Sequence, residues 1–348
     1  MSRRRPAGIL FIGVAIAAGL GAFLGTLDVK AAAAGWLAAF VFWCGPPIGS
    51  LVWMMIHRLT GGRWGVALYP VFAPTAALVP LIGILLIPVL IAMPALYSWM
   101  HGGTDVIPSV KHLYLNPAAF IIRSVVAFIG WTVLALALPR IHGSRATLLA
   151  GLGLVFYCVL ISLVPVDWIL SLEHPFVSES FGASVAVTHL MAALAWAAVL
   201  APRESEAVTS DLGGLLLAMV LAITYIDFMA LLVIWYGDLP EKVFWFTQRT
   251  HFPWTLLAYL AFICGSALPI LLLLFTRVRA NHFALRVIGA IVLLGLAVYD
   301  VYLVVPPFGL LALLAAGLAI VGMGCLMFGV SLLTIPAMAP QQRGSYVR

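Results

Sequence analysis

The stretch AAAAGWLAAFVFWCGPPIGSLVWMMI, residues 31–56, decides the fold class of this chain. It contains no charged side chain, and it is longer than the roughly 20 apolar residues that a helix needs to cross a bilayer. It is followed directly by the polar, basic stretch HRLTGGR, residues 57–63, which marks where the run ends at a membrane surface. The stretch therefore predicts a transmembrane helix.

Similar apolar runs recur along the whole chain, of which 64% of the 348 residues are hydrophobic and only 9% are charged. The predicted spans are 7–27, 31–56, 70–97, 116–138, 147–170, 181–200, 213–235, 254–275, 285–305 and 309–335. We therefore expect an all-α integral membrane protein with about ten transmembrane helices, forming a single polytopic membrane domain over residues 1–348. No soluble domain is expected, because the longest polar connection runs only from about Ser98 to Leu115.

The basic side chains predict how the helices are oriented. Of the 18 Lys and Arg residues, 13 fall in the terminal segments and in alternate loops: Arg3, Arg4, Arg5, Arg58, Arg63, Arg140, Arg145, Arg203, Arg277, Arg279, Arg286, Arg343 and Arg348. The opposite loops hold Lys30, Lys111, Lys242 and Arg249. Cytoplasmic loops carry an excess of Lys and Arg, so both termini are expected in the cytoplasm. The same bias accounts for the net charge of +6, and nucleic-acid binding is not expected.

The cysteines and histidines argue against a metal or redox cofactor on this chain. Four cysteines lie one each in four different spans, and none forms a CxxC pair: Cys44, Cys158, Cys264 and Cys325. Zinc and iron–sulfur sites need clustered thiolates. A haem within the membrane would need histidines on two facing helices, and only His189 is predicted near mid-membrane. We therefore expect no metal site.

Ionisable groups kept inside the hydrocarbon are the main functional signal in a membrane protein. Besides His189, this chain places four such groups within predicted spans: Arg123, Asp167, Asp227 and Asp300. The predicted topology brings all five to a similar depth, in the outer half of the bilayer. They therefore predict a shared hydrated pocket that opens on the periplasmic side.

Each of these residues also has a structural interpretation. Asp167 and Asp300 can be ordinary interfacial acids, and His189 can be a packing residue. Arg123 can extend its stem to the surface or pair with one of the aspartates. Asp227 is the hardest to explain in this way, because an apolar stretch separates it from the nearest charged loop residue and an unpaired buried carboxylate is costly. We therefore rank Asp227 first for a proton-linked role.

Three segments, taken in order, resemble a known family of membrane subunits. They are His-Arg-Leu-Thr-Gly-Gly-Arg-Trp-Gly at 57–65, Asp-Trp-Ile-Leu-Ser-Leu-Glu at 167–173, and the run at 227–241 that begins Asp-Phe-Met and ends Trp-Tyr-Gly-Asp-Leu-Pro-Glu. Together they are similar to the ActF subunit of bacterial alternative complex III, within the NrfD/PsrC-like group. The similarity in spacing and layout covers about residues 35–305, and this chain looks compact for that family.

The resemblance implies ten helices with two four-helix bundles and a location in the bacterial inner membrane. It also implies a place in an assembly that oxidises quinol and reduces a cytochrome c or a cupredoxin. The expected partners are a sister subunit of the ActC type, an iron–sulfur subunit and c-type cytochrome subunits, which hold the iron–sulfur clusters and haem c. This chain would then be a subunit rather than an enzyme on its own.

The resemblance further implies a quinone-facing pocket at Asp167, His189 and Asp227. A buried carboxylate or histidine there could accept the protons that quinol oxidation releases. Two alternatives remain open. The chain could be a scaffold for the extrinsic subunits, since the better-supported quinol site of the family belongs to the ActC-type subunit. It could also be a stand-alone secondary transporter, because the third span is interrupted by prolines and an acid lies in the membrane.

Overall fold

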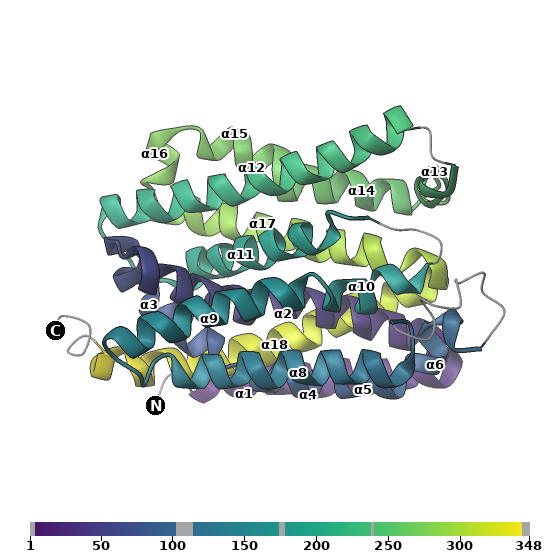
Figure 1. The fold of residues 1–348 in the computed structure, drawn as a ribbon, viewed down its shortest axis with the longest axis horizontal. Helices are drawn as coiled ribbons and strands as arrows, with labels where there is room; N and C mark the ends of the chain where they lie inside the picture. Colours follow the sequence, from purple (N-terminus) through teal and green to yellow (C-terminus); the bar gives the residue numbers. More distant parts are fainter. Residues whose placement is uncertain (1–3, 102–113, 174–177, 238–239, 343–348) are drawn as a thin grey trace.

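The structure is a computed structural model that describes residues 4–101, 114–173, 178–237 and 240–342 (Figure 1). These residues are almost entirely helical and include no strand. Within them, nine helices are long and apolar enough to cross a membrane. The expectation of an all-α, multi-pass integral membrane protein is therefore confirmed.

The helices lie over the ten predicted spans, with ends that differ by up to seven residues. The continuous helices are α1 (Arg4–Leu27), α2 (Val29–Thr60), α8 (Pro117–Ala137), α11 (Phe181–Leu200), α12 (Glu206–Gly237), α17 (His282–Val304) and α18 (Gly309–Gln342). The interrupted spans are α3 (Arg63–Ala76), α4 (Val79–Leu85) and α5 (Ile87–Ile91); α9 (Ser144–Ile161), α10 (Val164–Trp168) and η2 (Leu170–Leu172); and α14 (Trp254–Phe262), η3 (Ile263–Ala267) and α15 (Leu268–Leu273). The short connecting helices are α6 (Met93–Leu96), η1 (Ser98–His101), α13 (Pro240–Thr247), α16 (Thr276–Arg279) and η4 (Pro306–Phe308).

Helix α2 is the centre of the molecule. Its most apolar window is 94% buried, and it packs against α1, α3, α9, α11, α17 and α18. Small residues make these close contacts possible, as is common where helices pack in membranes. A Cβ atom on Gly35 would lie 2.5 Å from the backbone nitrogen of Ala316 in α18, and one on Gly49 would lie 1.9 Å from the carbonyl oxygen of His189 in α11.

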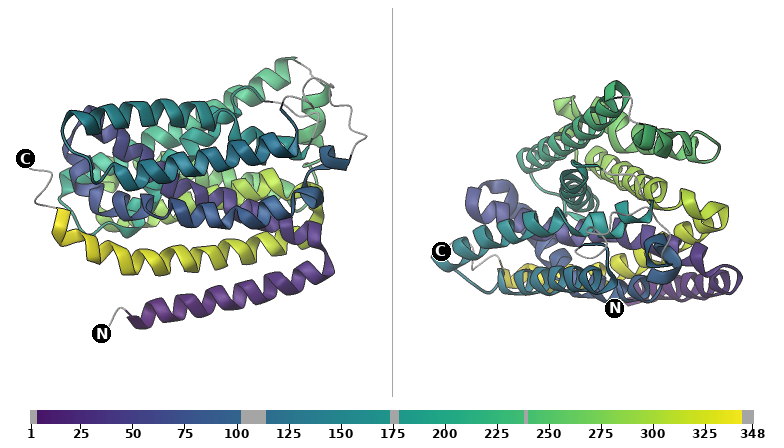
Figure 2. Two further views of the ribbon diagram at one scale, coloured as in Figure 1. Left: turned by 60° about the horizontal axis from the view of Figure 1, so that its bottom comes forward. Right: turned by 45° about the vertical axis from the view of Figure 1, so that its right-hand side comes forward.

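Most of the helices form two groups, and α2 belongs to the first group and also packs against the second (Figure 2). The first group contains α2 itself, the α3–α5 span, α8 and the α9–α10 span, and the second contains α11, α12, the α14–α15 span and α17. Helices α1 and α18 pack against each other and against α2, outside both groups. The layout agrees with two four-helix bundles plus extra helices.

Prolines divide the third span, as the sequence suggests. Helices α4, α5 and α6 each have a proline as their second residue, namely Pro80, Pro88 and Pro94. A proline lacks the N–H that would continue the helical hydrogen bonds, so the span bends at each break. At the end of α4 the indole N–H of Trp36 donates to the carbonyl oxygen of Leu85 at 2.9 Å, which anchors the broken span to α2.

The two ends of the molecule differ in charge. One end, here called the arginine end, carries the basic connections α2–α3, α8–α9, α11–α12 and α15–α17, and α1 begins and α18 ends there (Figure 1). The opposite end, here called the α13 end, carries α6, α10 and α13 (Figure 1). The cytoplasmic location of the arginine end stays a prediction.

Candidate functional site

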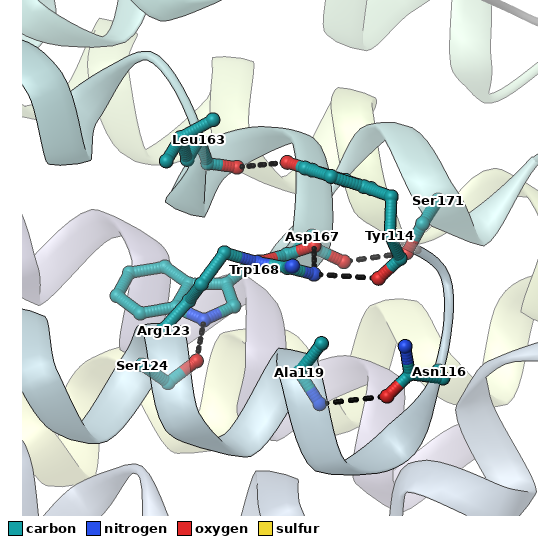
Figure 3. A network of polar contacts seen from close by, with 9 residues as sticks. All are labelled: Tyr114, Asn116, Ala119, Arg123, Ser124, Leu163, Asp167, Trp168 and Ser171. Carbon is teal, nitrogen blue, oxygen red and sulfur yellow. Dashed lines mark hydrogen bonds and ion pairs between the residues drawn. The ribbon is translucent and has the colours of Figure 1, made fainter. Parts of the chain in front are cut away.

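Arg123 and Asp167 form an ion pair between α8 and α10 near the α13 end (Figure 3). Nε and Nη2 of Arg123 donate to the two carboxylate oxygens of Asp167 at 2.6 and 2.7 Å, and Asp167 is 0% exposed. Nη2 also donates to the carbonyl oxygen of Tyr114 at 2.8 Å, and the guanidinium carbon lies 4.0 Å from the centre of the Tyr114 ring. The structural alternative for Arg123, pairing with an aspartate, is therefore the one observed.

The rest of the 167–173 segment is also fixed by contacts within the protein. The indole N–H of Trp168 donates to the hydroxyl of Ser124 at 2.9 Å (Figure 3). The Trp168 ring also stacks on Phe128, with 5.8 Å between ring centres. The Tyr97 hydroxyl donates to the carbonyl oxygen of Trp168 at 3.0 Å. The segment is an anchor between the α9–α10 span and α8.

Asp227 lines a cavity of about 230 Å³ bounded by α11, α12, α13 and α17, which we call the Asp227 cavity. The hydroxyl of Ser184 donates to Oδ1 of Asp227 at 3.3 Å. Among the described residues, none of the ion pairs involves Asp227. Five further lining residues are aromatic: Phe181, Trp245, Phe246, Tyr299 and Tyr302. The cavity thus combines one carboxylate–hydroxyl pair with flat apolar surfaces.

Asp300 and His189 line a second, enclosed cavity of about 10 Å³ between α2, α11 and α17. That space is close to the minimum for one water molecule. Asp300 is 4% exposed, and the described residues offer its carboxylate neither a hydrogen bond nor an ion pair. His189 is buried, and its Nδ1 lies 3.3 Å from the hydroxyl of Tyr157. This inner cavity has room for one water molecule, which can carry a proton, but for no larger ligand.

The two cavities are neighbours. Phe181, Ser184, Tyr299 and Leu303 line both of them. Tyr299 lines both cavities, so its side chain forms part of the wall between Asp227 and Asp300.

The expected single pocket for all five polar residues is therefore corrected. Asp227, Asp300 and His189 meet at the two adjoining cavities, whereas Arg123 and Asp167 line neither. The physical reason is that Arg123 and Asp167 face each other across neighbouring helices at the same depth. The charge of each side chain is neutralised by the other, so neither side chain lines a cavity.

A second buried ion pair was missed by the sequence reasoning, which treated Arg249 as an ordinary loop cation. Arg249 is 2% exposed, and Nη2 pairs with Glu173. Its guanidinium carbon lies 3.7 Å from the centre of the Trp245 ring, and Nη1 donates to the Trp245 carbonyl oxygen at 3.0 Å. The sequence contained one signal for this contact: Trp245 lies four positions before Arg249, a spacing at which an arginine can stack on an aromatic ring along a helical turn. Arg249 thereby supports a wall of the Asp227 cavity.

The 57–65 segment forms a rigid turn at the arginine end. Gly61 and Gly62 have φ angles of +71° and +108°, which favour glycine. Nε2 of His57 lies 3.0 Å from the Gly62 carbonyl oxygen, and Gly65 leaves room for the His57 ring. Beyond the turn, Arg63 makes a bidentate pair with Asp211 of α12 at 2.6 and 3.0 Å. The segment joins the two helix groups and takes no part in either cavity.

The third segment of the resemblance is described only in part. Residues 227–237 complete α12, and residues 240–247 form α13, but Asp238 and Leu239 lie outside the described residues. Of this segment, Asp227 is the residue that reaches a cavity with a hydrogen-bonding group.

The described residues hold no group of three or more His, Cys, Asp or Glu side chains that could bind a metal ion. No family model matches this chain, and no curated protein is similar to it. What the site can do chemically is bind a polar headgroup against flat aromatic walls and exchange a proton at Asp227.

Proposed function

We propose that this chain is the membrane subunit of a quinol-oxidising respiratory complex, similar to the ActF subunit of alternative complex III. The observation that carries the proposal is the Asp227 cavity, in which a carboxylate and the Ser184 hydroxyl face aromatic walls. The resemblance of the three sequence segments supports the same assignment. In this proposal the protein lies in the bacterial inner membrane, and the α13 end faces the periplasm.

The cavity suits the ring of a quinol better than a highly charged solute. Its volume of about 230 Å³ leaves room for a small ring, and Trp245 and Tyr302 offer apolar faces and edges against which such a ring can pack. A quinol hydroxyl can donate to the Asp227 carboxylate, and the Ser184 hydroxyl helps to orient that carboxylate. In this assignment Asp227 both binds the headgroup and receives its proton.

Quinol oxidation gives up electrons and protons together, and the two take different routes. The two electrons would be accepted by the iron–sulfur clusters and haem c expected on the partner subunits, which include a sister ActC-type subunit. The two protons would pass one after the other to Asp227, where a carboxylate can act as the general base. Ser184 and Tyr299 lie beside both cavities, so a proton can exchange with Asp300 and His189 through the inner cavity.

The test is an Asp227→Asn variant of the intact complex, purified in mild detergent and assayed for quinol-dependent reduction of the acceptor. Asn keeps the shape of the side chain but cannot take up a proton, so we expect turnover to fall about 100-fold or more, as is usual on loss of a general base. Asp211→Asn on the same helix is the control, because Asp211 lies at the arginine end and pairs with Arg63. Wild-type turnover in Asp227→Asn would exclude the proton role, and a protein recovered without cytochromes would exclude the complex.

A second candidate is a scaffold that anchors the extrinsic subunits without chemistry of its own. The observation in its favour is that Arg123, Asp167, Arg249 and Glu173 are all engaged in ion pairs within the protein. A complex that assembles and keeps full activity when both Asp227 and Asp300 are replaced by Asn would favour this candidate.

A further inference from the structure

A third cavity, of about 290 Å³, adjoins the Asp227 cavity along α12, and we call it the α12 groove. It is lined by Ser178, Glu179, Ser180, Tyr225, Ile226, Met229, Ala230, Val233, Ile234 and Lys242. Four of these residues, Ser178, Ser180, Ala230 and Ile234, also line the Asp227 cavity. The two spaces therefore share a wall, and Ala230 stands at their boundary on α12.

The groove runs along the helix axis at membrane depth. Tyr225, Met229 and Val233 are spaced four residues apart, so they form one stripe on α12 that is about 12 Å long. Their side chains are open to the outside, with Tyr225 64% and Val233 55% exposed. Helix α12 is the least buried of the nine candidate spans and lies at the edge of the bundle (Figures 1 and 2). We expect surfaces exposed there at this depth to face hydrocarbon.

The side of the Asp227 cavity that faces the α13 end is more closed than the side that faces the groove. Trp245 of α13 is buried there, and the Arg249 guanidinium, which pairs with Glu173, packs on its ring. Where the groove itself reaches the α13 end, Lys242 lies 3.7 Å from the Glu179 carboxylate, so its rim is charged. The groove is thus apolar along α12, polar at its rim, and connected at Ala230 to the one carboxylate in the neighbouring cavity.

We infer that the ligand of the Asp227 cavity enters from the membrane through the α12 groove and is an amphipathic molecule. Its hydrogen-bonding ring lies at Asp227 and Ser184, and its hydrocarbon tail lies along Tyr225, Met229 and Val233. The identity of the ring as a quinol rests on the proposed function, whereas the route of entry rests on the groove. A water-soluble solute, as a transporter would carry, does not fit this route.

The route can be tested without any ligand. A nitroxide spin label is attached at Ala230→Cys in a variant with Cys158, Cys264 and Cys325 replaced by Ser, reconstituted in lipid nanodiscs. Collision with oxygen, which concentrates in hydrocarbon, is compared with collision with a water-soluble nickel chelate. We expect the collision rate with oxygen to exceed that with the nickel chelate at Ala230→Cys. The reverse is expected at Glu206→Cys, which is exposed at the arginine end. A collision rate with the nickel chelate that exceeds the rate with oxygen at Ala230→Cys would overturn the inference.

The ligand class is tested with two quinols that share a ring, one with a decyl tail and one without. Met229→Trp fills the groove, and Leu221→Trp, exposed on the same helix outside the groove, is the matched control. We expect Met229→Trp to weaken binding of the decyl quinol at least tenfold and to leave the tail-less quinol unchanged. If the variant weakens both quinols equally, or neither, the inference fails. If wild type binds neither quinol while oxygen dominates at Ala230, the proposed function fails and the membrane route stands.

Discussion

Charged residues inside this membrane domain fall into two chemical situations. Asp167 meets an arginine that satisfies both of its oxygens, whereas the hydrogen bond found for Asp227 within the described residues comes from the hydroxyl of Ser184. A buried carboxylate with a bidentate partner has its interactions fixed within the protein, while one facing a cavity remains open to a ligand or a proton. Sequence could identify both as intramembrane acids, but it could not show which one finds a partner, because the pairing depends on which helices are neighbours.

Asp167 is therefore expected to matter for stability. Asp167→Asn would leave the partly buried Arg123 guanidinium without its counter-charge, so we expect a loss of about 3 kcal/mol in the free energy of unfolding, the lower end for a broken buried pair. The measurement is denaturant unfolding in detergent micelles. The double variant Arg123→Met with Asp167→Leu removes both charges and should recover most of that loss. A single variant with wild-type stability and lost turnover would instead make Asp167 part of the reaction.

Arg249 is expected to act on ligand binding through the wall that it supports. Arg249→Lys keeps the charge but loses the planar group that stacks on Trp245 and pairs with Glu173. We expect the dissociation constant of the tail-less quinol to rise about tenfold, corresponding to about 1.4 kcal/mol. Arg63→Lys, which alters an exposed pair at the arginine end, is the control. Equal affinities in Arg249→Lys and wild type would remove Arg249 from the site.

At the scale of the helices, the sequence predicted most of what the structure shows. The apolar runs located the ends of the spans to within seven residues, because a helix needs a nearly fixed apolar length to cross a bilayer. The prolines indicated that the third span is distorted, and it divides into α3, α4 and α5. The break between α9 and α10 and the π-helix η3 were not predicted, although a proline follows each of them, Pro165 in α10 and Pro269 in α15.

The contact between α2 and α11 depends on glycine, which gives an element-scale prediction. A Cβ atom on Gly49 would lie 1.9 Å from the backbone carbonyl oxygen of His189, so Gly49→Ala must push the two helices apart. Overpacking of this kind costs about 1–3 kcal/mol, and thermal unfolding in detergent should show the loss. Gly151→Ala in α9 is the matched control, because a Cβ there meets no atom within 4 Å. Similar melting temperatures for the two variants would contradict the close approach of α2 and α11.

At the scale of the whole molecule, the three segments of the resemblance have separate physical roles. The 57–65 turn links the helix groups at the arginine end, and the 167–173 segment links α8 and the α9–α10 span near the α13 end. The 227–241 segment contributes Asp227 to a cavity. The sequence predicted the fold class, and it named three of the residues that line the two cavities, Asp227, Asp300 and His189. It did not predict that they would be separated from Arg123 and Asp167, because that separation follows from how the two helix groups pack around α2.

The orientation in the membrane is the last prediction, and it decides from which compartment the cavities are approached. The excess of arginine at one end places that end in the cytoplasm, and hence the α13 end and the Asp227 cavity toward the periplasm. In intact cells, a membrane-impermeant thiol reagent should label Gln248→Cys, which is exposed at the α13 end, but not Arg145→Cys, which is exposed at the arginine end. Permeabilised cells should label both, which controls for reactivity. Labelling of Arg145→Cys alone in intact cells would reverse the topology and direct any proton released at Asp227 toward the cytoplasm.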